Sequence, residues 1–409
     1  MTPRTSIVIL ADDLTGAAEI AAAAWTRGLG AVVATGTVRS RVEGEVVVHD
    51  TDSRLLQPAD AARKIVSVAA RCRIAEARLS GALVLKKTDS VLRGPVLAEV
   101  DTLSAISHHA RVLLVPGNPR LGRVIRDGRF YVGGEPIDRS VFRHDPHHPA
   151  RSSSVADLLG PPRRGPIHFR KLGEPLPPTG VIVGEAATLE DIARWASCVD
   201  GDTLAAGSSV FLEAVLEARG HAPRAPAPAP RATTGVLIAS GTSADTTRAT
   251  LATLPRDAIA AFAMPEACAL SSGPEAARAI DRWAAELLGA LASRGRAVAL
   301  PPGTNLADPA SSGRIRAAFA AMIDQLHGVQ AFTHLVLEGG ATAAMVIHML
   351  RWNVLEVAGE PAPGVATLRP RQDPAFHVTL KPGTYPWPKH WWEPLTGAGT
   401  STSPSTTSS

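Results

Sequence analysis

Two adjacent carboxylates, Asp12 and Asp13, come one residue after the apolar run Ile7–Leu10 and shortly before Thr15 and Gly16. Paired carboxylates at the end of a strand can bind hydroxyl groups or Mg²⁺, or accept a proton from an alcohol. A simpler interpretation is that Asp13 or Thr15 caps a helix that begins near Gly16. Capping would account for only one acidic residue, so the pair together favours a chemical role.

A second polar cluster follows the predicted strand Ala82–Leu85. Such a turn can hold a carboxylate with Lys or Arg and sugar hydroxyls with Asp and Ser. A solvated turn with Asp89 or Ser90 as a helix cap would explain either residue alone, but it explains the whole set poorly. The candidate residues of this cluster are Lys86, Lys87, Asp89, Ser90 and Arg93.

A third predicted strand, Arg111–Val115, runs into a Pro- and Gly-containing loop that carries Arg123. Arg123 can meet an anion, although a structural turn with surface arginines explains this loop about as well. The residues that follow, Arg126–Ile137, predict a β-hairpin with a Gly-Gly turn.

The second half of the chain carries several glycine turns after apolar runs, at Ser240–Thr246, Leu335–Thr342 and Leu380–Tyr385. Small residues at the start of a helix favour anion binding, because unpaired backbone N–H groups and the helix dipole point at the ligand. Each turn alone is a weak signal, but together they make a nucleotide plausible. Neither GxxxxGK[ST] nor GxGxxG is present, so the sequence shows no P-loop and no dinucleotide fingerprint.

No metal-binding motif is recognisable. His144, His147 and His148 lie close together, but the HExxH pattern is lacking, and Pro146 and Pro149 exclude a regular helix. The three cysteines lie far apart and form no CxxC pair, which argues against a disulfide framework or a zinc site.

The elements that must position these residues are short β-branched runs alternating with amphipathic helices. This pattern predicts an α/β protein with two domains, each with a parallel or mixed sheet flanked by helices. Ligands of such sheets bind at the carboxyl ends of the strands, and we expect the sites there and in the cleft between the domains. We expect domains at 1–221 and 233–395, an Ala/Pro-rich linker at 222–232, and a disordered Ser/Thr-rich tail at 396–409.

Composition narrows the class of protein. Of the 409 residues, 45% are hydrophobic and 20% charged, which is typical of a globular chain. The net charge of +4 comes mostly from scattered arginines without an aromatic-rich basic stripe, so nucleic-acid binding is not expected. No apolar run is long enough to span a membrane, and the N-terminus lacks the pattern of a signal peptide. We therefore expect a cytoplasmic protein.

The ordered motifs ADDLTGA, KKTDSVLRGP, PGNPRLGR, SGTS, GGAT and KPGTYPWP together resemble the four-carbon acid sugar kinases over roughly Ser6 to Pro388. The resemblance implies an N-terminal sugar-acid-binding domain and a C-terminal nucleotide-binding domain of a non-P-loop type. It implies an enzyme that uses ATP and Mg²⁺ to phosphorylate the terminal hydroxyl of erythronate, threonate or 3-oxo-tetronate. The resemblance also suggests a homodimer.

The resemblance also assigns roles to residues, each through its motif. It implies Asp12 and Asp13 as the catalytic carboxylates, without settling which is the base, and it identifies no metal ligands. The substrate side comprises Lys87, Asp89, Ser90, Arg93 and Arg123. The ATP side comprises Ser243, Gly339, Gly340, Ala341, Thr342 and Gly383.

Two residues depart from the family's usual pattern. Val91 stands where the family usually has Thr, and Ala341 stands where it usually has Asp. Losing that Asp would weaken the organisation of Mg²⁺ or phosphate unless the metal is held elsewhere. The change at Ala341 motivates one alternative, a non-catalytic sensor of sugar acids or nucleotides. Another alternative, an NAD-dependent oxidoreductase, fits the α/β pattern but lacks its fingerprint.

Overall fold

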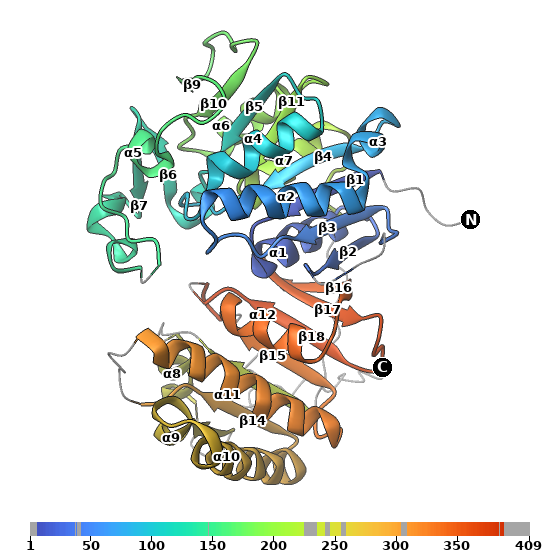
Figure 1. The fold of residues 1–409 in the computed structure, drawn as a ribbon, viewed down its shortest axis with the longest axis vertical. Coiled ribbons are helices and arrows are strands. Elements are labelled where there is room, and N and C mark those ends of the chain that lie inside the picture. Colours follow the sequence, from blue (N-terminus) through green and yellow to red (C-terminus); the bar gives the residue numbers. More distant parts are fainter. Residues whose placement is uncertain are drawn as a thin grey trace, which may run out of the picture. The chain divides into compact units, whose positions relative to one another are not determined.

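The computed structural model describes residues 6–36, 38, 42–145, 147–224, 235–241, 246–254, 259–303, 309–383 and 385–387. The chain divides into two compact units (Figure 1). Unit 1 comprises Met1–Ala229 and Trp352–Asp373, and unit 2 comprises Pro230–Arg351 and Pro374–Ser409. Most of the expected linker and the whole expected tail lie outside the described residues.

Unit 1 is built on a mixed sheet that confirms the expected fold class. The spatial order of its strands is β17-β16-β2-β3-β1-β4-β11-β5-β10-β9. All neighbours are parallel except β16, which pairs antiparallel with both β2 and β17. The strands are β1 (Ile7–Ala11), β2 (Ala31–Ala34), β3 (Val46–Asp50), β4 (Leu83–Lys87), β5 (Arg111–Val115), β9 (Ile167–Arg170), β10 (Gly180–Gly184), β11 (Thr203–Gly207), β16 (Val354–Ala362) and β17 (Val365–Pro370).

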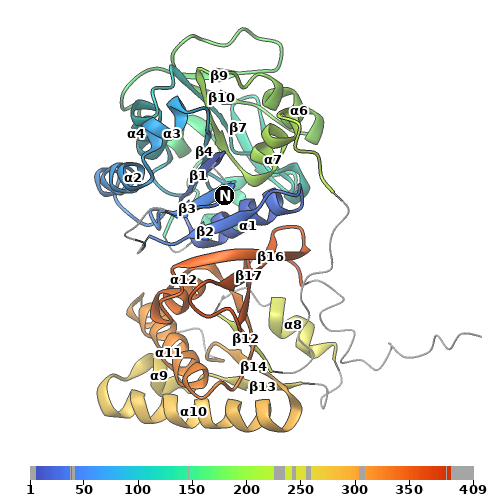
Figure 2. The same cartoon turned by 90° about the vertical axis from the view of Figure 1, so that its right-hand side faces the viewer.

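Helices cover both faces of this sheet (Figure 2). Helices α2 and α4 pack against each other on one face, and α7 packs with α1 and α6 on the other. The strands between them are apolar along nearly their whole length, as expected of strands that are covered on both sides. The helices are α1 (Leu14–Trp25), α2 (Pro58–Cys72), α3 (Ile74–Leu79), α4 (Val96–Ile106), α5 (Val155–Leu159), α6 (Leu189–Ser197) and α7 (Ser209–Ala218).

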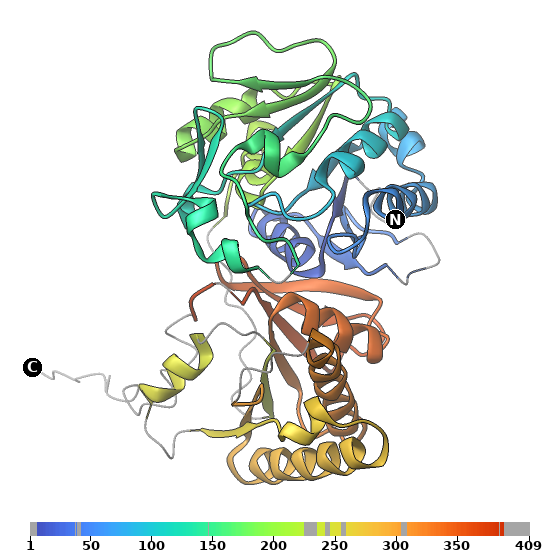
Figure 3. The same cartoon turned by 60° about the vertical axis from the view of Figure 1, so that its left-hand side comes forward.

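A small second sheet lies beside the main one (Figure 3). It consists of β6 (Arg123–Arg126), β7 (Arg129–Val132) and β8 (Glu135–Pro136), with Gly133 and Gly134 in the turn between the last two. This confirms the expected hairpin. One short 3₁₀ helix, Pro119–Leu121, precedes this sheet, and two more follow it at Ile137–Arg139 and Val141–His144.

The β16–β17 hairpin differs from the expected organisation. The second half was expected to be continuous over 233–395, whereas the structure assigns Trp352–Asp373 to unit 1. The physical reason is strand pairing, because Leu355 lies opposite Val33 and extends the sheet beyond β2. Pairing satisfies the backbone groups of β2 that would otherwise form an open edge.

Unit 2 contains a parallel sheet with the strand order β13-β14-β12-β15-β18. Helix α11 packs against α9, α10 and α12, whereas the end of α8 approaches an apolar cluster formed by β12, β14 and β15. The strands are β12 (Val236–Ser240), β13 (Ala260–Ala263), β14 (Arg296–Leu300), β15 (His334–Glu338) and β18 (His377–Lys381). The helices are α8 (Thr246–Ala252), α9 (Glu266–Leu270), α10 (Gly273–Arg294), α11 (Pro309–Gly328) and α12 (Gly340–Met349). Within the described ranges, no helix has both the length and the apolarity that a membrane crossing requires.

Candidate functional site

The polar candidates of unit 1 gather where its central strands end. Ala11 is in register with both Asp50 and Lys87, and Lys87 is in register with Gly207. Because these neighbouring strands are parallel, the residues that follow them emerge at one edge of the sheet. The predicted Asp12 and Lys87–Arg93 groups therefore lie together at this edge, as the sequence indicated.

Arg54 binds both predicted catalytic carboxylates. Its Nε donates to Asp12 Oδ2 at 2.7 Å, and its two terminal nitrogens donate to the two Asp13 oxygens at 2.7 and 2.8 Å. Burial opposes ionisation of Asp12, but the charge of Arg54, with smaller contributions from Lys86 and Lys87, holds its pKa below the usual value. Both carboxylates are thus oriented by one guanidinium.

The two carboxylates differ in what else they contact. Asp13 Oδ1 accepts from Gly16 N at 2.9 Å and Oδ2 accepts from the Thr15 hydroxyl at 2.6 Å, so Asp13 is the N-cap of α1. This confirms the capping interpretation for Asp13. Asp12 is 1% exposed, and its Oδ1 has no hydrogen-bond partner in the described part of the protein. The capping interpretation therefore leaves Asp12 unexplained, as the sequence suggested.

The turn after β4 is organised by an internal ion pair. Asp89 accepts from the Arg93 backbone N–H and from its guanidinium, the latter at 2.8 and 2.9 Å. Burial alone would raise the pKa of Asp89, but Arg93 and Arg54 hold it well below its usual range. Arg93 also donates to Asp145 at 3.1 Å. The predicted residues Asp89 and Arg93 thus bind each other and fix the shape of the turn.

Gly94 allows this turn to approach Arg54 closely. Its φ is +89°, and a Cβ at this position would lie 2.9 Å from the Arg54 carbonyl oxygen. His148 contacts the same carbonyl through Nε2 at 3.0 Å. The backbone of Arg54 is therefore held from two sides, which helps to fix its guanidinium against the carboxylates.

Ser90 and Arg123 meet across the edge of the sheet. Arg123 donates to the Ser90 hydroxyl at 2.6 Å, and its guanidinium lies over the Phe142 ring at 5.2 Å. Both residues are buried. The structure thus brings Arg123, from a separate sheet, next to the cluster after β4, which spacing along the sequence alone did not establish.

Lys86 and Lys87 have protein partners already. Lys86 is fully buried and lies 3.3 Å from Glu99, whose other oxygen accepts from Ser53. Lys87 lies 3.5 Å from Glu19 and donates to the Thr88 carbonyl at 3.0 Å. The ammonium group of the predicted substrate residue Lys87 is therefore held against α1.

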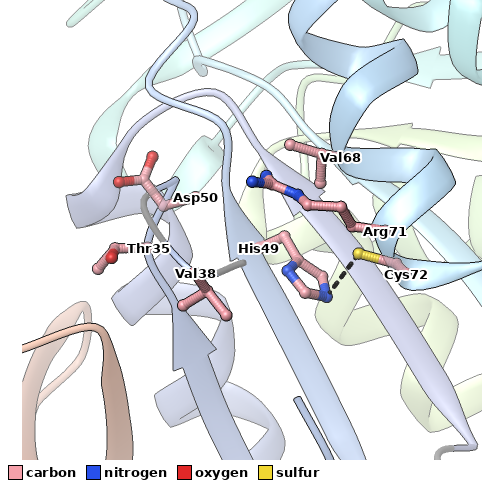
Figure 4. Close-up of a pocket in the computed structure, with 7 residues that line it drawn as sticks. All are labelled: Thr35, Val38, His49, Asp50, Val68, Arg71 and Cys72. Carbon is pink, nitrogen blue, oxygen red and sulfur yellow. Dashed lines mark hydrogen bonds between the residues drawn. The ribbon is translucent and has the colours of Figure 1, made fainter. Parts of the chain in front are cut away.

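A small pocket lies at the end of β3 (Figure 4). His49 Nε2 and the Cys72 sulfur lie 3.0 Å apart on one side of it, and Asp50 lies on the other. Burial, reinforced by the charge of Asp52, raises the pKa of Asp50 to about 8. Burial and Arg71 lower the pKa of His49 to about 4. The volume of about 10 Å³ admits no more than one water, so this pocket does not hold a sugar acid.

The turns predicted for the nucleotide begin at the strand ends of unit 2. Ser240, Glu338 and Lys381, the last residues of three adjacent strands, are in register. Gly339 has φ +101° and precedes α12, whose exposed second residue is Ala341. Thr342 is buried and its hydroxyl faces the Gly241 carbonyl at 3.4 Å. Gly340 begins α12 and Gly383 follows β18, whereas Ser243 lies outside the described residues.

Several residues of both sites were not predicted. Arg54, Glu99 and Ser53 were missed in unit 1. For Ser53 and Arg54, the polar run directly after Val46–His49 was a usable signal. In unit 2 the buried pair Glu338 and Lys381 was missed, although each charge closes an apolar strand. Val91, the first departure from the family pattern, is 3% exposed and belongs to the hydrophobic core of unit 1.

Mg²⁺ can be tested against the donor atoms of the described residues. No three His, Cys, Asp or Glu residues among them are grouped closely enough to hold a metal ion. Asp12 Oδ1 is a buried carboxylate oxygen with no hydrogen-bond partner among the described residues. This donor set fits an ion that is held mainly by phosphate and water oxygens with at most one carboxylate, as is common for Mg²⁺.

Comparison with known families agrees with this division of the sites. A model for a sugar-binding N-terminal domain matches residues 7–215. A model for a nucleotide-binding C-terminal domain matches residues 237–385. Each predicted set of site residues thus falls within the family domain whose description suits it.

Two kinases of four-carbon sugar acids are similar to this chain over most of its length, and a third is similar over a shorter part. A D-threonate kinase of Cupriavidus necator is 28% identical over 428 residues, covering 96% of this chain and 98% of the relative. A 3-oxo-tetronate kinase of Methylobacterium radiotolerans is 27% identical, covering 92% and 95%. A D-threonate kinase of Bordetella bronchiseptica is 36% identical, but over only 38% of this chain and 39% of the relative.

Solved structures share the fold at low sequence identity. A Salmonella typhimurium protein described as a putative tRNA synthase has a TM-score of 0.74 and 18% identity, covering 93% of this chain and 96% of that one. A Haemophilus influenzae protein has a TM-score of 0.67 and 19% identity, covering 95% and 99%.

Proposed function

Since the chain belongs to the four-carbon acid sugar kinase family, we propose that it transfers the γ-phosphoryl group of ATP to the terminal hydroxyl of a four-carbon sugar acid. Threonate, erythronate and 3-oxo-tetronate are the candidate substrates, because the similar enzymes are named for them. Unit 1 would bind the acid and unit 2 the nucleotide.

The observation that carries this proposal is the state of Asp12. It is an ionised carboxylate at the carboxyl end of β1, and its Oδ1 is buried without a partner in the described protein. A buried acceptor of this kind is costly unless a donor meets it. A substrate hydroxyl is such a donor, so Asp12 is suited to orient the hydroxyl and accept its proton.

Asp13 is less suited to this task. Both its oxygens accept from Arg54, and each also accepts a local hydrogen bond from α1. We therefore assign the base role to Asp12 and assign to Asp13 the positioning of Arg54.

In the proposed transfer, one bond to phosphorus forms as another breaks, and Asp12 takes up the proton that the hydroxyl loses. The hydroxyl oxygen of the acid forms a bond to the γ-phosphorus as the bond to the bridging β–γ oxygen breaks, and ADP leaves. The hydroxyl proton passes to Asp12. Mg²⁺ held mainly by the phosphates would supply charge neutralisation, and most of the rate enhancement would come from positioning.

The remaining predicted residues of unit 1 divide into two groups. Ser90 and Arg123 are suited to bind the acid, because a hydroxyl and a buried guanidinium lie together at 2.6 Å beside the turn after β4. Asp89 and Arg93 hold that turn through each other, and Lys87 supplies positive charge from its place against Glu19.

On the nucleotide side, the backbone of Gly339, Gly340 and Gly383 is suited to approach phosphates, because these residues carry no Cβ. Thr342 ties the turn before α12 to Gly241. Ala341 and Ser243 remain predictions for the ATP side.

The proposal is tested by measuring ADP release from ATP and Mg²⁺ with erythronate, threonate and 3-oxo-tetronate as acceptors. Turnover with one acid, lost in Asp12→Asn, supports the kinase and names its substrate. ATP binding without turnover on any acid would favour the sensor suggested by Ala341. Failure to bind ATP would overturn the assignment of unit 2.

A further inference from the structure

Unit 2 contains a fully buried ion pair at its strand ends. Lys381 Nζ lies 2.6 Å from Glu338 Oε1, and both side chains are 0% exposed. Burial lowers the pKa of Lys381, and the charge of Glu338 opposes this shift. Buried ion pairs contribute little net stability compared with apolar residues of similar size, because both charges must be desolvated. Stability alone is thus a weak reason for this pair, and its other contacts point to a different role.

The second oxygen of Glu338 accepts hydrogen bonds from two hydroxyl groups of unit 2. Oε2 accepts from the Ser240 hydroxyl at 2.5 Å and also from the Thr247 hydroxyl. Ser240 ends β12 and Thr247 lies in the first turn of α8. One carboxylate oxygen thus joins the last residue of β12 to the first turn of α8.

Lys381 connects the turn after β18 to Glu338. Its ammonium group donates to the Pro382 carbonyl at 3.2 Å and lies 4.9 Å from the centre of the Trp387 ring. The Trp387 indole N–H donates to Thr247 at 2.8 Å. Backbone hydrogen bonds complete the connection, from Gly241 N to Glu338 O at 2.9 Å and from Gly339 N to Lys381 O at 3.1 Å.

From these contacts we propose that Glu338 and Lys381 are positioning residues for the nucleotide, which hold the turns after β15 and β18, with Gly241 beside them, in one phosphate-binding arrangement. The proposal rests on the assignment of ATP to unit 2. Neither side chain needs to touch the nucleotide, since both act through the backbone of the glycine turns. Correct placement of such N–H groups is what makes a helix N-terminus bind phosphate.

The test removes both charges together. Replacing one partner alone would leave the other charge buried and destabilise the fold, so the informative variant is Glu338→Leu combined with Lys381→Met. In this double variant we expect the KM for ATP to rise by about tenfold or more, equivalent to about 1.4 kcal/mol of binding. At saturating ATP, the KM for the sugar acid should be unchanged. Circular dichroism and thermal unfolding report whether the variant is folded.

Ser240→Ala is a second variant, which keeps the ion pair and removes only the hydrogen bond from β12 to Glu338. It is expected to raise the KM for ATP by a smaller factor, about threefold. Thr379→Val is the matched control. It removes a buried hydrogen bond of 2.8 Å between Thr379 of β18 and His334 of β15, at a place away from the turns. It should lower the melting temperature and leave the KM for ATP unchanged.

The outcomes separate this inference from the proposed function. If the wild-type protein binds no ATP, the assignment of unit 2 fails. If the wild type binds ATP and both the folded double variant and Ser240→Ala bind it equally well, the pair is structural and the positioning role is wrong. If the double variant does not fold, Ser240→Ala decides alone, and an unchanged KM overturns the inference.

Discussion

Lys86 and Lys87 are consecutive residues, but their ammonium groups form ion pairs on opposite faces of the unit 1 sheet. Lys86 lies 3.3 Å from Glu99 of α4, and Lys87 lies 3.5 Å from Glu19 of α1. Alternation of side chains along β4 sends the two charges to different helices. Both helices are thereby anchored at the edge where Asp12 and Asp13 emerge.

Asp12→Asn should reduce kcat by about 10²–10⁴-fold, the range typical of a lost general base. Asp13→Asn should instead lower thermal stability and raise the KM for the sugar acid, because Asp13 caps α1 and orients Arg54. Steady-state kinetics and thermal unfolding of the two variants distinguish these effects. Equal losses of kcat without a change in stability would contradict the division of roles.

Much of the fold could be predicted from periodicity. The strand Arg111–Val115 has the expected ends, because apolar runs flanked by Gly or charge mark buried parallel strands. The hairpin of β16 and β17 was missed, since β16 (Val354–Ala362) contains Gly359 and Pro361 and only part of its length is buried. Its pairing with β2 joins residues more than 300 positions apart, and local patterns carry no information about such a contact.

For the candidate site, the sequence predicts where the polar residues gather but not which side chains contact each other. The cluster around Asp12 could be predicted, because polar residues at the ends of adjacent parallel strands meet at one edge. The pairing of Asp89 with Arg93 was not predicted, because the residue types suit an external ligand as well as each other. Side-chain partners depend on turn geometry, such as the positive φ at Leu92 and Gly94, which composition does not encode.

Arg54→Lys should impair the enzyme although it keeps the charge. A lysine cannot donate to Asp12 and bidentately to Asp13 at the same time, as Arg54 does. We expect a loss of about 1–3 kcal/mol in unfolding free energy and a higher KM for the sugar acid, with the KM for ATP unchanged. Lys64→Arg, on α2, makes the opposite exchange, from lysine to arginine, and is the control. It should leave the KM for the sugar acid unchanged. Wild-type kinetics in Arg54→Lys would show that the fork geometry is dispensable.

Asp50 should make the protein less stable as the pH rises. Its pKa is raised to about 8 in the folded protein from an ordinary value of 3.8, so the folded state retains a proton that the unfolded state has lost. The resulting stabilisation is present at low pH and is lost progressively between about pH 4 and pH 8. In Asp50→Asn, the fall in melting temperature between pH 5 and pH 8 should be smaller than in the wild type. Asp60→Asn, on the exposed side of α2, should follow the wild-type profile.

Gly94→Ala should damage the site as well as the fold. At φ +89° any Cβ is strained, and here it would also lie 2.9 Å from the Arg54 carbonyl oxygen, so Arg54 must move. We expect a stability loss of about 1–3 kcal/mol together with a raised KM for the sugar acid.

Gly128→Ala is the matched control for this prediction. Its φ is +69°, but the added Cβ would meet no atom within 4 Å. Backbone strain alone should then cost about 1–2 kcal/mol, and the KM for the sugar acid should not change. If both variants lose stability equally and neither changes this KM, the close approach of Gly94 to Arg54 has no part in positioning the guanidinium.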